Sequence, residues 1–158
     1  MDSDQDRTRT DALAFLKRHK TGVLATLSAQ GVPRSRLIYY VCDNEFRIYF
    51  STLLNTRKYE DFSAHPQASF VVATEDVPQT LQIEGLVSEI TDEQKMEQEL
   101  APLVEVLMSN NSFHWPTLKL DPGEVGLMQL TPTWVRWADY AFAQKGSEHV
   151  FKEVELNR

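Results

Sequence analysis

The chain has 158 residues, of which 42% are hydrophobic and 25% are charged, a composition typical of one globular domain. Sixteen Lys and Arg against 23 Asp and Glu give a net charge of -7, which argues against binding to nucleic acids or to anionic membrane surfaces. We expect one domain over residues 1–158, in which the charged segments 1–9 and 145–158 are candidate mobile tails.

The chain contains a single cysteine, Cys42, so it forms no internal disulfide and has no Cys-rich zinc site. Cys42 lies in an apolar segment, and we expect a buried thiol and not an activated nucleophile. The four histidines do not show metal-site spacing, so no metal is predicted. A polar N-terminus and the lack of long apolar runs predict a cytoplasmic protein without a membrane span.

The first half of the chain predicts a helix followed by strands. Apolar residues at helical spacing predict a helix that starts near Thr10 and ends before Gly22. Residues 23–28 and 32–41 are rich in β-forming residues and flank a turn at Gly31, which is typical of a hairpin. Alternating residues predict a further strand over 46–50. A helix is expected over 55–64, with Thr56 as its N-cap.

The second half predicts further strands and one more helix. Residues 68–73 and 81–90 are apolar strands, and Gly85 marks a bulge or a close backbone approach. A helix is expected from Thr91 to Met108, and two last strands over 123–130 and 134–138. We expect Trp134 and Trp137 to share one face of the last strand. About six strands with few helices indicate a mainly β protein, a small antiparallel barrel with flanking helices.

One candidate ligand site lies where the third strand gives way to a helix. The segment 51–58 combines Ser51, Thr52, Arg57 and Lys58 with the N–H groups of a helix start. Helix N-termini, hydroxyls and cations together bind phosphate dianions. A capped surface helix with solvated cations explains the same residues, and residue types alone favour it somewhat.

Two arginines on the second strand are candidates for the same site. Arg34 and Arg36 share strand parity with Ile38 and Tyr40, so both can point into a cleft beside the helix start. An exposed edge strand, on which arginine discourages aggregation, is an equally good explanation. No nucleophile elbow, Walker loop or dinucleotide-binding glycine motif is present, and no catalytic acid or base can be assigned.

In order and spacing, these segments resemble the pyridoxamine 5'-phosphate oxidase-like family of FMN-binding split barrels. The resemblance runs from about residue 10 to residue 139 and is carried by the segments 22–28, 31–33, 36–40, 48–52, 56–58, 65–69 and 83–85. It implies a six-stranded antiparallel split β-barrel and a homodimer with two FMN molecules in grooves between the subunits.

The resemblance also implies site residues. The strand from Ser35 to Tyr40, which includes Arg36, Leu37 and Ile38, would lie along the flavin. Arg36, or Arg34 in its place, would contact the phosphate. Ser51 and Thr52 would contact the ribityl chain or phosphate. Arg57 and Lys58 would clamp the phosphate. Gln82, or Thr80, would approach the isoalloxazine edge, and Trp137 would reach in from the partner subunit.

The predicted function is that of a flavin-dependent oxidoreductase acting on an unidentified small molecule, in which the flavin supplies the redox step. The alternative is a non-catalytic flavin carrier or stress-response sensor, and relatives that bind F420 or haem make these two further cofactor candidates. True pyridoxamine phosphate oxidases grip their substrate with an Arg-x-His motif near the C-terminus. The chain has no such match after Trp137, so vitamin B6 oxidation is not expected.

Overall fold

The computed structural model describes residues 3–91, 101 and 125–157. Within them, eight antiparallel strands form one curled sheet in the order β2-β1-β5-β6-β7-β4-β3, with β8 added to β7. The mainly β architecture predicted from the sequence is confirmed, with eight strands where six were expected. The strands are β1 (Thr21–Leu27), β2 (Pro33–Tyr39), β3 (Val41–Cys42), β4 (Ile48–Leu53), β5 (Gln67–Thr74), β6 (Gln79–Glu89), β7 (Val125–Asp139) and β8 (Phe151–Glu153).

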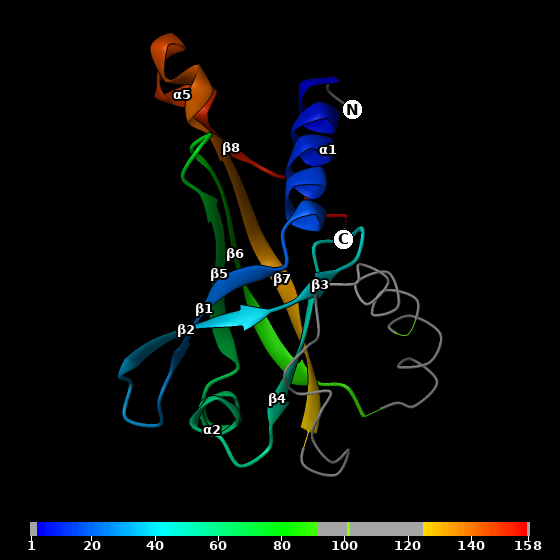
Figure 1. Cartoon of the computed structure of the whole chain (residues 1–158), viewed down its shortest axis with the longest axis vertical. Coiled ribbons are helices and arrows are strands. Elements are labelled where there is room, and N and C mark those ends of the chain that lie inside the picture. The colour runs from blue at the N-terminus through cyan, green and yellow to red at the C-terminus, as the bar shows by residue number, and fades with distance from the viewer. Residues whose placement is uncertain (1–2, 92–100, 102–124, 158) are drawn as a thin grey trace.

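Helices flank the sheet at both ends (Figure 1). Among the described residues, the two longer helices are α1 (Ser3–Arg18) and α2 (Arg57–Ala64), and two short ones, η4 (Tyr140–Lys145) and α5 (Ser147–Val150), follow β7. The helix α2 packs against β1 and β4. The helix expected from Thr91 to Met108 lies, apart from Thr91 and Ala101, outside the described residues.

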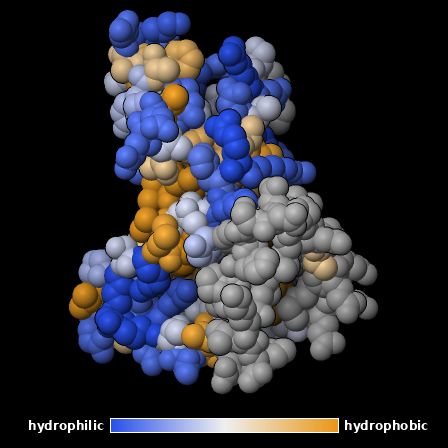
Figure 2. All heavy atoms as spheres, viewed as in Figure 1, coloured by the Kyte–Doolittle hydropathy of each residue, from blue (hydrophilic) through white to orange (hydrophobic). Residues whose placement is uncertain are grey.

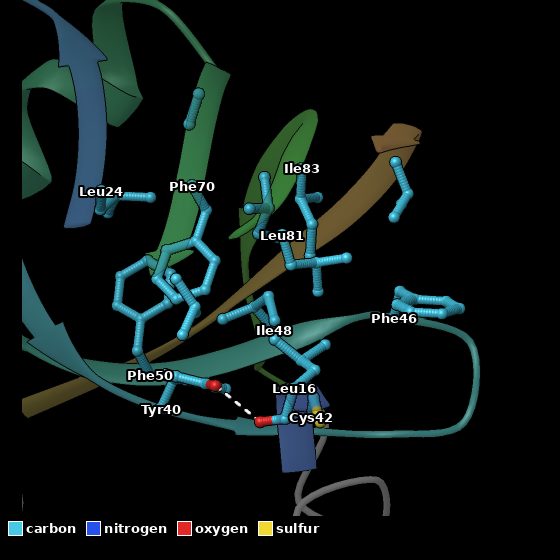
Figure 3. Close-up of a cluster of buried hydrophobic side chains, with 14 of the residues drawn as sticks. Leu16, Leu24, Tyr40, Cys42, Phe46, Ile48, Phe50, Phe70, Leu81 and Ile83 are labelled. Atoms are coloured by element: carbon cyan, nitrogen blue, oxygen red, sulfur yellow. Dashed lines mark hydrogen bonds between the residues drawn. The ribbon is translucent and has the colours of Figure 1, made fainter. Parts of the chain in front are cut away.

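The core forms because alternate residues of each strand point to the inside of the curled sheet. Figure 3 shows side chains from β1, β4, β5 and β6 gathered around one centre. The phenol of Tyr40 is buried there and donates a hydrogen bond of 2.6 Å to the carbonyl oxygen of Leu16, which ties the end of α1 to the barrel (Figure 3). Fully buried members of this cluster include Leu16, Leu24, Phe46, Ile48, Phe50, Leu81 and Ile83.

The predicted irregularity at Gly85 is confirmed. The register between β6 and β7 shifts between Glu84 and Gly85, and the backbone of β7 approaches closely there. A Cβ atom on Gly85 would lie 2.1 Å from the carbonyl oxygen of Thr131. The strand β7 continues through this point, so the two separate final strands expected from the sequence are one.

The expectation that Trp134 and Trp137 share a face is wrong. Successive strand residues alternate between faces, so residues three apart lie on opposite sides. Trp137 is 6% exposed and lies in the core, edge-on to Phe15 at 4.8 Å between ring centroids. Trp134 lies on the outer face, where the Arg136 guanidinium carbon is 5.4 Å from its ring centroid.

The terminal segments also have regular structure. The helix α1 starts at Ser3, earlier than expected, and its Thr8 is buried. At the other end β8 pairs with β7, and Val154 is buried. Lys152 donates to the Asp4 carboxylate at 2.9 Å, so the two ends of the chain contact each other.

Candidate functional site

A buried carboxylate on α2 gathers two arginines from β2. Asp61 has a side chain that is 2% exposed, and its Oδ1 lies 2.8 Å from Arg34 Nη1, while its Oδ2 lies 3.2 Å from Arg36 Nη2. Both arginines project from the face of β2 that also carries the buried Ile38, as strand parity predicted. The structure therefore brings Arg34 and Arg36 to the helix at which the sequence analysis placed a phosphate.

The hydroxyl of Thr26 on β1 links two members of this group. It donates to Asp61 Oδ2 at 2.8 Å and accepts from Arg36 Nη1 at 2.7 Å. Thr26 itself is buried. Three elements, β1, β2 and α2, are thus joined by one hydrogen-bonded network.

Lys58 adds a third positive charge, one turn before Asp61 on α2. Burial, and then the positive charge of Arg36, lower the pKa of Lys58 below its ordinary value. Its Nζ lies 5.8 Å from the ring centroid of Phe50, and it forms no ion pair with any described residue. We call Arg34, Arg36, Lys58 and Asp61 the cation cluster: three positive charges and one negative charge leave two positive charges.

The start of α2 lies beside this cluster. Thr56 is the N-cap residue of the helix, as predicted, but its hydroxyl donates to the Leu53 carbonyl oxygen at 2.8 Å and caps no helix N–H group. The hydroxyl of Thr52 is buried and lies 3.2 Å from that of Thr56. The positive end of the helix dipole and the cluster therefore act on the same region.

The other residues predicted to contact the cofactor differ in their exposure. Arg57 is exposed and Ser51 is half-buried on β4. On β2, the side chain of Leu37 is 64% exposed on the outer face, whereas Ile38 is 4% exposed and belongs to the core. Their roles as cofactor contacts stay predictions.

Gln82 and Trp137 do not join the cation cluster. Gln82, on the outer face of β6, accepts a hydrogen bond of 2.5 Å from Arg136 Nη2. Trp137 lines a cleft of about 240 Å³ between α1 and the segment that follows β7. The assignments of Gln82 to the isoalloxazine edge and of Trp137 to the partner's cofactor likewise stay predictions.

Sequence reasoning missed Asp61 and Thr26. Two arginines on the buried side of a strand need a counter-ion, and that requirement was the available signal. Asp61 stands 25 residues beyond Arg36, in a helix where Arg57, Glu60 and Ser63 are exposed, so nothing local marked it as the partner. Thr26 is one of several hydroxyl residues on β-forming segments.

The described residues contain no cluster of three or more potential metal ligands. Cys42 is buried as predicted, and burial is the main cause that raises the pKa of its thiol to about 12. A thiol with so high a pKa carries almost no thiolate at neutral pH, so it is a poor nucleophile.

An apolar strip lies on the outer face of the β1–β2 hairpin. Val23 and Leu37 are paired across the two strands, and Tyr39 follows on the same side of β2. Their side chains are 38%, 64% and 37% exposed. Figure 2 shows hydrophobic surface midway along the molecule, in the region where β1, β2 and β5 lie in Figure 1.

A sequence profile described as pyridoxamine 5'-phosphate oxidase matches residues 9–137 of the chain. No curated protein sequence matches the chain. None of the described helices has the length and apolar character of a membrane span, and the cytoplasmic location stays a prediction.

Solved structures share the fold. A Listeria innocua protein named for pyridoxamine 5'-phosphate oxidase has a TM-score of 0.64 and 21% identity, covering 82% of this chain and 96% of its own. An FAD-binding protein from Mesorhizobium loti has a TM-score of 0.62 and 17% identity, covering 80% and 90%. A protein named F420 reductase has a TM-score of 0.61 and 23% identity, covering 77% and 93%.

Proposed function

Because the chain belongs to the pyridoxamine 5'-phosphate oxidase family, we propose that it binds FMN as a homodimer and acts as a flavin-dependent oxidoreductase on a small molecule. The observation that carries the proposal is the cation cluster. Its two uncompensated positive charges match the charge of a phosphate monoester, which is close to a dianion at neutral pH.

The chemistry of the cluster fits a phosphate group better than a carboxylate or a neutral ligand. Each guanidinium has five N–H donors, of which the described contacts use one on Arg34 and two on Arg36. Their side chains are 25% and 22% exposed, so they are accessible as well as ordered. Lys58 and the start of α2 add positive charge beside them.

FMN, when bound, supplies the redox chemistry through its isoalloxazine ring. The residues of this chain bind and orient it: the cation cluster fixes the phosphate, and the hydroxyls of Ser51 and Thr52 are candidates for the ribityl chain. The names of the Mesorhizobium loti FAD-binding protein and the F420 reductase support a cofactor of the flavin or deazaflavin type.

The homodimer is supported by the apolar strip on β1 and β2. Val23, Leu37 and Tyr39 lie next to one another on one surface, and a second copy of the chain is an occupant that would remove them from water. This strip is on the opposite face of β2 from Arg34 and Arg36, so β2 would contribute both to the dimer and to the phosphate site.

The absorbance spectrum of the freshly purified protein, together with its mass in solution, tests the proposal. We expect flavin absorbance at about 450 nm that NAD(P)H or another donor bleaches and an added acceptor restores. Flavin that is bound but neither bleached nor restored would favour the carrier or sensor. A haem or F420 spectrum would replace FMN as the proposed cofactor. A colourless monomer that takes up neither FMN, F420 nor haem would overturn the proposal.

A further inference from the structure

We infer that Asp61 is a positioning residue, which holds Arg34 and Arg36 in the orientation that binds the cofactor's phosphate. The inference rests on the proposed function and deepens it by assigning a role to a carboxylate in an anion site. It follows from the contacts of Asp61 and from its sign of charge.

The contacts of Asp61 fix both guanidinium groups at once. Its Oδ1 lies 2.8 Å from Arg34, and its Oδ2 accepts from Thr26 at 2.8 Å and from Arg36 at 3.2 Å. Charge-assisted hydrogen bonds of this kind are short and directional. Because Asp61 belongs to α2, the two arginines of β2 are held in a fixed relation to the start of that helix.

A carboxylate here weakens the attraction for an anion, since it lowers the net charge of the cluster from three to two. Its presence is therefore not explained by charge alone. Arginine side chains have several rotatable bonds, and fixing them before the ligand arrives removes an entropic cost from binding. Asp61 thus weakens the electrostatic attraction for the phosphate but holds the two arginines in place. Removing its charge would strengthen phosphate binding if the first effect were larger and weaken it if the second were larger.

The test compares FMN with riboflavin, which lacks the phosphate, in wild type and Asp61→Asn. Dividing the two affinities isolates the phosphate contribution, because a general packing defect weakens both ligands alike. We expect the wild type to prefer FMN and the variant to lose about 10- to 100-fold of that preference. A preference that is unchanged or larger in Asp61→Asn would overturn the inference and leave the phosphate site intact.

A wild type that binds FMN no better than riboflavin would instead overturn the phosphate site itself, and with it this inference. The two failures are therefore distinguishable by the wild-type ratio alone. The affinities are measured from flavin fluorescence quenching with cofactor-free protein.

Thr26→Val provides a second variant, which keeps the charge of Asp61 if Asp61→Asn does not fold. It removes the hydroxyl that joins Asp61 to Arg36, and we expect the FMN preference to fall by about 3- to 10-fold. Thr74→Val, which removes a hydroxyl bonded to Val77 on a distant turn, is the matched control and should leave the ratio unchanged. Equal effects of the two threonine variants would overturn the inference.

The mobility of the Arg34 and Arg36 guanidinium groups can be measured without the cofactor. In ¹⁵N NMR spectra of cofactor-free protein, we expect Arg34 and Arg36 to show restricted side-chain motion in wild type and free rotation in Asp61→Asn. Arg57, which is exposed, serves as the internal reference for a mobile guanidinium. Equal mobility of Arg34 and Arg36 in wild type and variant would contradict a positioning role.

Discussion

Lys58 of α2 and Arg36 of β2 lie close enough for the charge of Arg36 to lower the pKa of Lys58, an effect second only to that of burial. Asp61 pairs with Arg36 but has no ion pair with Lys58. Two cations from different elements are therefore held together with incomplete compensation. Such an arrangement costs stability in the free protein and is relieved by an anion.

Replacing Lys58 tests whether this charge binds the phosphate. We expect Lys58→Met to weaken FMN binding by about 1.5–3 kcal/mol, the usual size of a hydrogen bond to a charged group, and to leave riboflavin binding nearly unchanged. Arg57→Met is the matched control on the exposed neighbour, with an expected loss below about 1 kcal/mol. Calorimetric titration measures both, and a larger loss from Arg57→Met would assign the clamp to that residue.

The lowered pKa of Lys58 predicts an alkaline limit to FMN binding. Above its lowered pKa, Lys58 loses its charge, so FMN affinity should begin to fall below the ordinary lysine value of 10.5. The cofactor-free protein should respond with the opposite sign. Between the folded and unfolded pKa values the unfolded state binds more protons, so this group makes the free energy of unfolding rise with pH.

Fluorescence titrations and urea unfolding, each at several pH values, measure these two trends. Lys58→Met should remove both, because it has no proton to lose. An FMN affinity that falls equally in wild type and Lys58→Met would assign the alkaline limit to another group.

Leu37 tests the dimer. Placing a charge in the centre of the apolar strip should prevent a second copy from covering it, so Leu37→Glu is expected to sediment as a monomer. Val77→Glu is the matched control, since Val77 is 53% exposed on the turn between β5 and β6, away from the strip. A Leu37→Glu variant that remains dimeric would move the interface to another surface.

Gly85 tests the close approach between β6 and β7. Gly85→Ala should lower the free energy of unfolding by about 3 kcal/mol or more, because the new methyl group meets the backbone of Thr131. Gly31→Ala should cost only about 1 kcal/mol, since the surrounding space is open and only its φ of 76° is unfavourable. Urea denaturation gives both values, and a smaller loss at Gly85 than at Gly31 would contradict the described register.

The sequence predicted those parts of the fold that depend on local patterns. The hairpin around Gly31, the strand β4 with its alternating Ile48 and Phe50, and the bulge at Gly85 each have a signal within a few residues. Strand β7 was expected as two strands, over 123–130 and 134–138, whereas in the structure it runs on through Pro132, which lies at the bulge opposite Gly85. The short β8 was missed because its charged residues resemble a solvated tail.

The candidate site was also predicted only where it depends on local sequence signals. Arg34, Arg36 and Lys58 were found because cations at a strand and a helix start are visible in the sequence. The contacts of Arg34 and Arg36 with Asp61 were not found, because they join positions 27 and 25 residues apart through the tertiary fold. Strand parity gave the direction of the arginines but could not show what they would meet.

The phosphorus signal of FMN bound to the protein tests the central claim most directly, because it reports the charge of the phosphate at the cation cluster. A free phosphate monoester loses its second proton near a pH of about 6. Held by Arg34, Arg36 and Lys58, the dianion should persist at least about one pH unit lower, since nearby cations favour the charged form. A ³¹P NMR titration in which bound FMN changes protonation at the same pH as free FMN would show that these side chains do not hold it.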